Sequence, residues 1–271
     1  MKNTYITRVL VCRPSHYQVN YSINPWMVPG SVNVKRAMDQ WKTLIDIYQR
    51  LGVAVEIIDQ EPQLPDMVFT ADQGIIKNNR VLLSNFRYPE RQGERSPYKK
   101  WFLEHNFITL SAPDDCFFEG HGEAIFWRDK LLLGVGFRAN KEAASAISKK
   151  LGIEVIPLQL VDPKFYHLDT CFFALNSETA FFYPQAFSES SQKMLQKVVP
   201  QLFAFTNNEV TGFAANSIVT DHHVLINTGC PSFTRRIRQL GYEAQELKMS
   251  EFVKSGGSIH CLTQVLSQII Y

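Results

Sequence analysis

The amino-acid sequence predicts an α/β fold in which a unit of two strands and a helix recurs around a closed ring. An apolar run, a tight polar turn and a second apolar run occur four times along the chain. The turn centres lie roughly 45–50 residues apart, a spacing typical of propellers and repeat arrays. The four units span 73–94, 122–145, 170–195 and 216–240, with turns at Asn78-Asn79, at Arg128-Asp129, near Asn176-Ser177 and at Asp221-His222.

A fifth strand pair would come from the two ends of the chain. The C-terminal run CLTQVLSQII (261–270) and the N-terminal run ITRVLVCRP (6–14) could each supply one strand. Chain ends that meet in one unit would close the ring and leave no open sheet edge. The alternative is a two-layer α/β fold whose hairpins share no symmetry.

Apolar residues at helical spacing predict helices between the strand pairs. Residues 34–51 place Ala37, Trp41, Leu44, Ile45 and Tyr48 near i, i+3, i+4 and i+7 positions. Residues 141–151 and 188–199 follow a similar pattern, and the second of these begins with a Ser-x-x-Ser sequence typical of an N-cap. In the first unit, the strand pair is expected to be followed by a loop.

The composition excludes several classes of protein. A chain of 271 residues can form one large domain or two small ones. Its net charge is +2 and it has no dense Lys/Arg tract, so nothing indicates nucleic acid or an anionic membrane as a partner. No apolar stretch approaches the length of a membrane span, and the short N-terminal apolar run is interpreted as a strand rather than a signal peptide. We expect a soluble, cytoplasmic protein, and its oligomeric state, monomer or homo-oligomer, stays open.

The five cysteines do not form a disulfide framework, because their number is odd and none belongs to a CxxC pair. Cys12 and Cys171 lie in strand-like runs and are expected to be buried core residues. Cys261 differs, because it follows Gly256-Gly257, where the backbone can approach a ligand closely.

A short segment dense in functional side chains precedes each strand pair. At equivalent places in a ring, such segments would converge on one axis. Each residue alone also has a structural interpretation: Asp66 can form a turn, Glu119 can cap a helix, and His167 can be a satisfied group at a strand end. The segments are PDMVFTADQG (65–74), CFFEGHGEAIF (116–126), FYHLDTCFF (165–173), TGFAANSIV (211–219) and GGSIHCLT (256–263).

The residue types in these segments favour a cationic substrate. Cys261 becomes a nucleophile if nearby positive charge or a bound cation stabilises its thiolate. His167 is the natural acid/base, since its pKa suits proton transfer near neutral pH. Asp72, Glu119 and Asp169 would repel one another beside a thiolate unless a cation lay among them. A planar guanidinium fits that place, because carboxylates pair with it in bidentate fashion.

With these motifs the chain resembles the guanidino-group-modifying superfamily, the penteins, which includes arginine deiminase, dimethylargininase, arginine dihydrolase and glycine amidinotransferase. The matching motifs PDMVFTADQ, FEGHGEAI, YHLDTCF and GGSIHCLTQ occur in family order over nearly the whole chain. The resemblance implies a five-bladed α/β propeller of ββαβ repeats, with residues 1–271 forming a single catalytic domain whose terminal strands close the ring.

The resemblance also implies roles for individual residues. Cys261 would be the nucleophile and His167 the general acid/base. Glu119 would orient His167 and, together with Asp72 and Asp169, hold the guanidinium.

Three more residues would bind the substrate. Arg138 matches the arginine that grips the substrate α-carboxylate in dimethylargininase-like enzymes. Arg91 would be a second clamp, with Arg87 as the alternative, and Asn24 resembles a residue of the substrate loop in arginine dihydrolases. Each of the three could instead be a structural or surface residue.

Two departures leave the substrate open. Dimethylargininases usually carry an acidic residue where this chain has Ala71. Arginine dihydrolases tend to carry Asn where this chain has Asp72.

The implied reaction is hydrolysis of arginine or a methylated arginine through an S-alkylthiouronium intermediate on Cys261. It gives citrulline, or ornithine after a second cycle, and it requires no metal or cofactor. His222-His223 and His260-Cys261 are poor candidate ligand pairs, because adjacent side chains on a strand point to opposite faces.

The rivals are amidino transfer to an amine, action on agmatine or peptidyl-arginine, and, from another class, a non-catalytic binding pentein like the ribosome anti-association factors.

Overall fold

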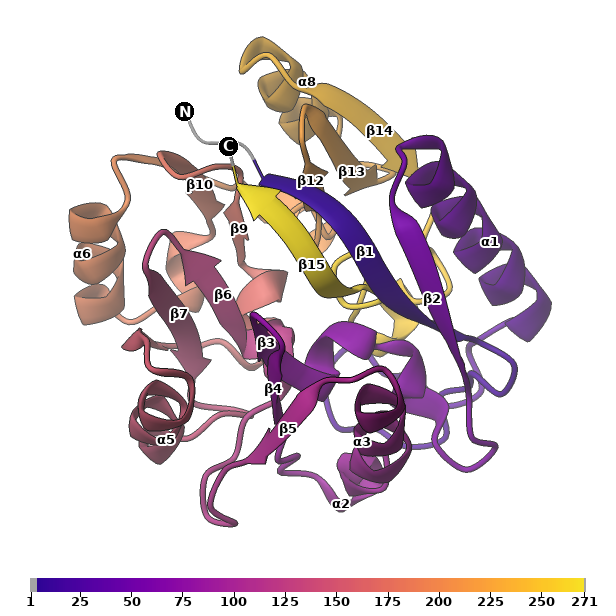
Figure 1. Ribbon diagram of the computed structural model, residues 1–271. Coiled ribbons are helices and arrows are strands. Elements are labelled where there is room, and N and C mark those ends of the chain that lie inside the picture. Colours follow the sequence, from indigo (N-terminus) through magenta and orange to yellow (C-terminus); the bar gives the residue numbers. More distant parts are fainter. Residues whose placement is uncertain (1–3, 271) are drawn as a thin grey trace.

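Five three-stranded sheets surround a common centre in the computed structural model, which describes residues 4–270 (Figure 1). In each sheet the middle strand pairs antiparallel with one neighbour and parallel with the other, and a helix connects the parallel pair. This is a ββαβ unit, as predicted. The sheets have the orders β15-β1-β2, β3-β4-β5, β6-β7-β8, β9-β10-β11 and β12-β13-β14.

The strand bounds follow the units around the ring. They are β1 Thr4–Arg13, β2 Ala54–Asp59, β3 Gly74–Lys77, β4 Arg80–Leu83, β5 Ile108–Ser111, β6 Ala124–Trp127, β7 Lys130–Val135, β8 Glu154–Gln159, β9 Phe172–Ala174, β10 Thr179–Phe182, β11 Gln201–Ala204, β12 Ile218–Thr220, β13 His223–Asn227, β14 Glu243–Leu247 and β15 Gln264–Ile270.

The longer helices lie on the outside of the ring (Figure 1). The α-helices are α1 Val34–Arg50, α2 Pro89–Gln92, α3 Arg95–Glu104, α4 Gly120–Glu123, α5 Lys141–Leu151, α6 Glu189–Val198, α7 Asn207–Thr211 and α8 Pro231–Gln239. The short 3₁₀ helices are η1 Pro65–Val68, η2 Thr70–Gln73, η3 Pro163–Phe165, η4 Leu168–Thr170, η5 Pro184–Ala186 and η6 Val253–Ser255. Within residues 4–270, no helix has both the length and the apolar character needed to cross a bilayer.

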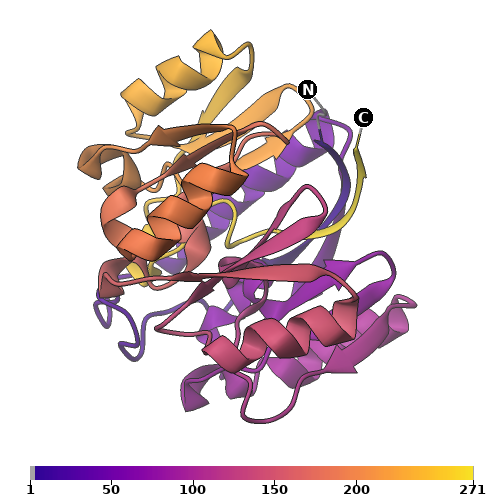
Figure 2. The same ribbon diagram turned by 90° about the vertical axis from the view of Figure 1, so that its left-hand side faces the viewer.

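The two ends of the chain share one sheet. Strand β15 pairs antiparallel with β1, from Thr4 opposite Ile270 to Leu10 opposite Gln264. Both views show these strands side by side, indigo against yellow (Figures 1 and 2). The pairing completes the fifth unit.

The predicted hairpin turns are confirmed. Asn78, Arg128 and Asp221 each have a left-handed backbone, with φ of 56°, 56° and 52°. Two-residue hairpins favour such a conformation because its twist matches that of the flanking strands.

The predicted helices 34–51, 141–151 and 188–199 correspond to α1, α5 and α6. Ser188 caps α6 by accepting a hydrogen bond from the Ser191 amide at 3.3 Å. The loop expected after the first strand pair is wrong, since α2 and α3 lie there. Tyr98, Trp101 and Phe102 form the buried face of α3, and Pro97 is tolerated because first-turn amides have no partner within the helix.

Each outer helix buries an apolar face against its own sheet. Trp41, Leu44 and Tyr48 of α1 pack with Val9 and Val11 of β1 in one core cluster. Burial of each such side chain contributes roughly 1.5–3 kcal/mol. Cys12 and Cys171 are buried core residues, as predicted. The apolar side chains thus hold the helices outside, and the segments that precede the inner strands meet at the centre.

Candidate active site

The five polar segments predicted to converge do meet at the ring centre. Each precedes the first strand of its sheet, and neighbouring segments are joined by hydrogen bonds. The amide of Ala71 donates to the carbonyl of Cys261 at 3.1 Å, and the amide of His260 donates to the carbonyl of Asn216 at 3.1 Å. Gly122 packs so closely that a Cβ there would lie 2.5 Å from Oδ1 of Asp72 and 2.7 Å from Nδ1 of His167. Glycine is therefore required at this position of the FEGHGEAI motif.

The sulfur of Cys261 lies between a carboxylate and an amide. Its Sγ donates to Oδ2 of Asp169 at 3.0 Å and accepts from Nδ2 of Asn216 at 3.0 Å. Burial, reinforced by the charges of Asp169 and Asp72, raises the pKa of the Cys261 thiol well above its usual range. The protonated thiol form of Cys261 is therefore favoured.

His167 lies beside two of the predicted acids. Its Nε2 is 3.0 Å from Oε2 of Glu119, and its Nδ1 is 3.8 Å from Oδ1 of Asp72. Burial opposes protonation of the ring, but Asp72 and Glu119 outweigh it and raise the pKa of His167. The imidazolium form, which can protonate a leaving group, is thus favoured in the site.

Five carboxylates leave one buried oxygen each without a hydrogen-bond partner among residues 4–270; two of them are Asp66 and Glu123, and the other three are the predicted acids of the site. In those three acids the oxygens are Oδ1 of Asp72, Oε1 of Glu119 and Oδ1 of Asp169. Buried acceptors normally have partners, and an unpaired one costs about 1–3 kcal/mol. An incoming group with several N–H donors would remove this cost.

Arg138 is nearly fully buried and lies between two aromatic rings, with its Cζ 4.7 Å from the centroids of both Tyr88 and Tyr166. Its Nη1 donates to Oε2 of Glu119 at 2.7 Å and its Nη2 to the carbonyl of Ile23 at 3.1 Å. The predicted clamp therefore reaches the site, where it is paired with a carboxylate of the protein.

Arg91 also lies in the cluster, but its N–H donors already bind groups of the protein. It donates to Oδ2 of Asp72 at 2.7 Å, to both oxygens of Glu94 at 2.9 Å, and to the carbonyl of Asp66 at 3.3 Å. In this geometry Arg91 holds the carboxylate of Asp72 in place and has no free donor for a substrate. The alternative residue, Arg87, is exposed and donates to the carbonyl of Phe137 at 3.3 Å.

Asn24 belongs to the segment between β1 and α1 that covers the site. Its Nδ2 donates to the carbonyl of Ser255 at 3.0 Å, next to the glycine pair that precedes Cys261. In the same segment, the Trp26 indole donates to the carbonyl of Lys164 at 2.8 Å. Cys261 is only 2% exposed and His167 0%, so both side chains lie beneath the surface of the protein.

Sequence reasoning missed Asn216 and Glu123, although both lie in the motif segments. The Oδ1 of Asn216 accepts from the amides of Ser258 and Cys261 at 2.9 and 3.1 Å, which fixes the loop that carries the sulfur. Oε2 of Glu123 accepts from the amide of Glu119 at 2.5 Å. Burial raises the pKa of Glu123 to about 8, whereas Arg138 and His167 overcome burial and hold the pKa of Glu119 below its usual range.

In the part of the chain that the structure describes, one group of side chains could hold a metal ion. Ligand atoms of Asp72, Glu119 and His167 lie within 4.8 Å of one another. Arg91 and Arg138 already pair with these carboxylates and supply positive charge, so the donor set suits an organic cation with N–H groups better than a bare ion.

Known proteins resemble the chain over nearly its whole length. Residues 13–267 match the family of eukaryotic N,N dimethylarginine dimethylhydrolase. The bifunctional arginine dihydrolase/ornithine cyclodeaminase ArgZ of Synechocystis sp. is 36% identical over 263 residues, which cover 94% of this chain and 37% of that protein. The chain thus spans little more than a third of that bifunctional relative. An N(G),N(G)-dimethylarginine dimethylaminohydrolase of Mycobacterium tuberculosis is 35% identical, with 94% of this chain and 84% of that protein covered.

Solved structures agree with the fold. The N-terminal domain of cyanobacterial ArgZ, as a cysteine-to-serine variant bound to substrate, superposes with a TM-score of 0.93 at 34% identity, covering 96% of this chain and 98% of that one. A dimethylarginine dimethylaminohydrolase adduct with S-methyl-L-thiocitrulline has a TM-score of 0.81 at 19% identity, covering 95% of this chain and 98% of that one, which concerns the fold alone.

The five-bladed α/β propeller and these relatives place the chain among the penteins that modify guanidino groups. Within that class, it belongs to the dimethylarginine dimethylhydrolase family. The named relatives in this family are hydrolases that act on C–N bonds of amidines.

Proposed function

We propose that the protein hydrolyses the guanidino group of free arginine or a methylated arginine through a covalent intermediate on Cys261. The observation that carries the proposal is the set of unpaired buried oxygens on Asp72, Glu119 and Asp169, in the site that also holds the sulfur. A guanidinium has up to five N–H donors in a plane and can satisfy several of these oxygens at once.

The proposed reaction uses the same groups twice. The bound cation favours the thiolate of Cys261, which attacks the guanidinium carbon. His167, held as an imidazolium by Asp72 and Glu119, protonates the leaving nitrogen, and ammonia or a methylated amine departs. Neutral His167 then takes a proton from water, which attacks the S-alkylthiouronium carbon. The C–S bond breaks, and a ureido product such as citrulline leaves.

Arg138 is the proposed ligand of the substrate α-carboxylate. Its guanidinium is anchored by Tyr88 and Tyr166, so an exchange of the carbonyl of Ile23 for a substrate carboxylate requires little movement of the arginine. The same exchange would release the covering segment, because Ile23 belongs to it. Arg91 is proposed to position Asp72 instead of contacting the substrate.

The relatives do not distinguish arginine from dimethylarginine as the substrate, because enzymes named for each are about equally similar to this chain. ArgZ is named an arginine dihydrolase and the mycobacterial protein a dimethylaminohydrolase, at 36% and 35% identity.

We propose that residues 1–271 form one catalytic domain, since β1 and β15 share a sheet. All five cysteines are free thiols, which suits a reducing compartment such as the cytoplasm.

The test is a product assay on arginine, asymmetric dimethylarginine and agmatine, scored for citrulline, ornithine and released amine. A ureido product or ornithine from arginine or its methylated form, absent with Cys261→Ala, is expected. Amidination of an added amine without ureido product would replace hydrolysis by amidino transfer. Absence of turnover, together with unchanged binding in Cys261→Ala, would favour a binding module.

A further inference from the structure

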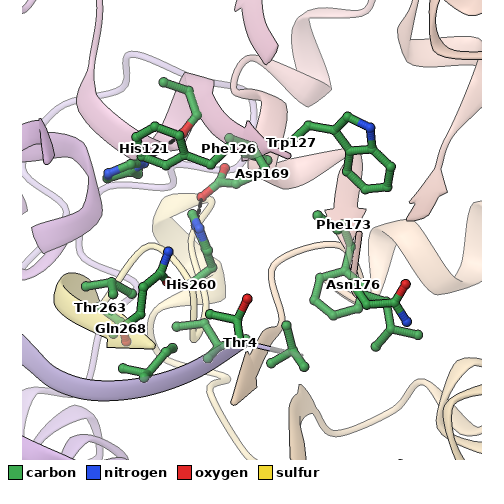
Figure 3. Close-up of a pocket in the computed structure, with 18 of the residues that line it drawn as sticks. Thr4, His121, Phe126, Trp127, Asp169, Phe173, Asn176, His260, Thr263 and Gln268 are labelled. Carbon is green, nitrogen blue, oxygen red and sulfur yellow. Dashed lines mark hydrogen bonds and ion pairs between the residues drawn. The ribbon is translucent and has the colours of Figure 1, made fainter. Parts of the chain in front are cut away.

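A cavity that is open to solvent reaches Asp169 and His260, on the side of the ring away from the segment that contains Asn24. This cavity of about 1410 Å³ lies between the hairpins, and its lining includes the turn residues Asn78, Asp129 and Ser177. Figure 3 shows this cavity with Trp127, Phe173 and Asn176 in its wall. The active-site segments precede the strands, whereas these turns follow the first strand of each pair, so the cavity occupies the opposite end of the ring axis. Asn78 and Asp129 are exposed, and the cavity therefore opens to solvent.

Asp169 connects the sulfur to this rear cavity. One oxygen, Oδ2, accepts from Sγ of Cys261 at 3.0 Å and lies 2.9 Å from Nδ1 of His260. Figure 3 shows Asp169 and His260 joined along the cavity wall. Cys261 and Asp169 are 2% and 1% exposed, whereas the His260 side chain is 23% exposed. His260 is thus the solvent-contacting end of a three-residue series.

The proposed reaction needs such a series. The Cys261 thiol donates to Asp169 in the closed site and must lose its proton before the sulfur attacks. Among the described residues, Sγ of Cys261 hydrogen-bonds to Asp169 and Asn216 and not to His167, which Asp72 and Glu119 already favour as an imidazolium. The front of the site is closed by the segment that contains Asn24. The rear is the direction in which a solvent-connected acceptor lies.

We propose that Asp169 and His260 carry the thiol proton of Cys261 into the rear cavity, an inference that rests on the hydrolase function proposed above. The S–H bond breaks and the sulfur keeps the electron pair as a thiolate. The proton binds Oδ2 of Asp169 and passes to the bare Nδ1 of His260, which carries its own hydrogen on Nε2 before the transfer. The resulting imidazolium releases a proton from Nε2 to water in the cavity. The reverse transfer restores the thiol after the product leaves.

Among the described residues, the other histidine lining the cavity is unsuited to this role. Nδ1 of His121 lies 2.8 Å from the carbonyl of Ala124, and its Nε2 accepts from the amide of Ile76 at 3.3 Å. Burial, reinforced by nearby His260, lowers the pKa of His121 to about 4. It therefore stays neutral, with both nitrogens bound to backbone. The remaining charged groups of the lining lie in the hairpin turns or directly beside them: Lys77, Arg128, Asp129 and Glu178.

The test follows formation of the Cys261 adduct in single-turnover experiments with quenched-flow mass spectrometry. His260→Asn can still form a hydrogen bond with Asp169 but cannot relay a proton, so adduct formation should slow by roughly 10²-fold, the scale of general acid–base effects. Substrate affinity and melting temperature should stay near the wild-type values. His260→Gln serves as a second substitution if the first variant folds poorly.

Chemical rescue separates proton transfer from support of the fold. Free imidazole can enter a cavity of this size, so it should restore adduct formation in His260→Ala in proportion to its concentration. Gln268→Ala, which changes an exposed residue of the same cavity wall, should show neither the loss nor a response to imidazole.

Failure of the proton relay can be distinguished from failure of the proposed hydrolase function. Wild-type adduct formation combined with an unaffected His260→Asn, or a defect in His260→Ala that imidazole does not change, would overturn the relay alone. Absence of a wild-type adduct with every guanidino substrate would overturn the proposed function and the relay together.

Discussion

Asn216 provides a sharp test of how the sulfur is held. Its side chain is fully buried and makes three contacts with the nucleophile loop: Nδ2 to Sγ of Cys261 at 3.0 Å, and Oδ1 to the amides of Ser258 and Cys261 at 2.9 and 3.1 Å. Asn216→Ala removes all three contacts. Asn216→Asp keeps both acceptor contacts and removes the donor to sulfur, so the two variants separate folding from catalysis.

The expected magnitudes differ between the two variants. In Asn216→Ala two buried amides lose their acceptor, at about 1–3 kcal/mol each, so the free energy of unfolding should fall by about 2–6 kcal/mol. In Asn216→Asp this loss is avoided. A hydrogen bond to a charged group contributes about 1.5–3 kcal/mol, which predicts adduct formation slower by roughly 10–150-fold. The added carboxylate should slow it further, because it opposes the thiolate.

Denaturant unfolding and single-turnover adduct formation measure the two effects. Asn216→Asp should react slowly and lose stability only through its buried carboxylate, whereas Asn216→Ala should lose the amide contacts as well as the reaction rate. If Asn216→Asp formed the adduct at the wild-type rate, the amide would not stabilise the thiolate. If Asn216→Ala had wild-type stability, the two amides would have found other acceptors.

Three further predictions concern the acids and the clamp. Asp72→Asn should shift the product balance toward ornithine, since arginine dihydrolases tend to carry Asn there; unchanged citrulline-to-ornithine ratios, measured by chromatography, would count against it. Glu123 has its pKa raised from 4.5 to about 8, so the wild type loses stability as pH rises between these values, by up to about 1.4 kcal/mol per pH unit. Glu123→Gln cannot ionise and should flatten this decline in pH-dependent denaturant unfolding, and an unaltered slope would refute the assignment. Arg138→Ala should raise KM for arginine at least about tenfold, the effect of losing one charge-assisted hydrogen bond, but should change KM for agmatine little; equal effects on both substrates would remove the α-carboxylate from its role.

The sequence predicted the repeating unit because its evidence is local. Turn pairs such as Asn78-Asn79 and Asp221-His222 specify hairpins through their own backbone preferences, and α1 shows its buried face as an apolar period. The helix α3 was not predicted, because Pro97 and a polar first turn obscure the helical spacing of its buried aromatic residues.

The site was predictable in composition but not in its pairings. Regular placement of the motif segments indicated which residues would converge. It could not show that Arg91 would be engaged by Asp72 and Glu94, or that Asp169 would contact both Cys261 and His260. Such contacts depend on the relative heights of loops from different units, which no single segment encodes.

The central claim is a covalent intermediate on Cys261, and peptide mapping of protein quenched during turnover of arginine tests it most directly. An amidino adduct that appears on the peptide with Cys261, decays at the rate of product release and is absent in Cys261→Ala is the predicted result. Product formation with Cys261 unmodified at every quench time, or an adduct confined to another of the five cysteines, would contradict the account.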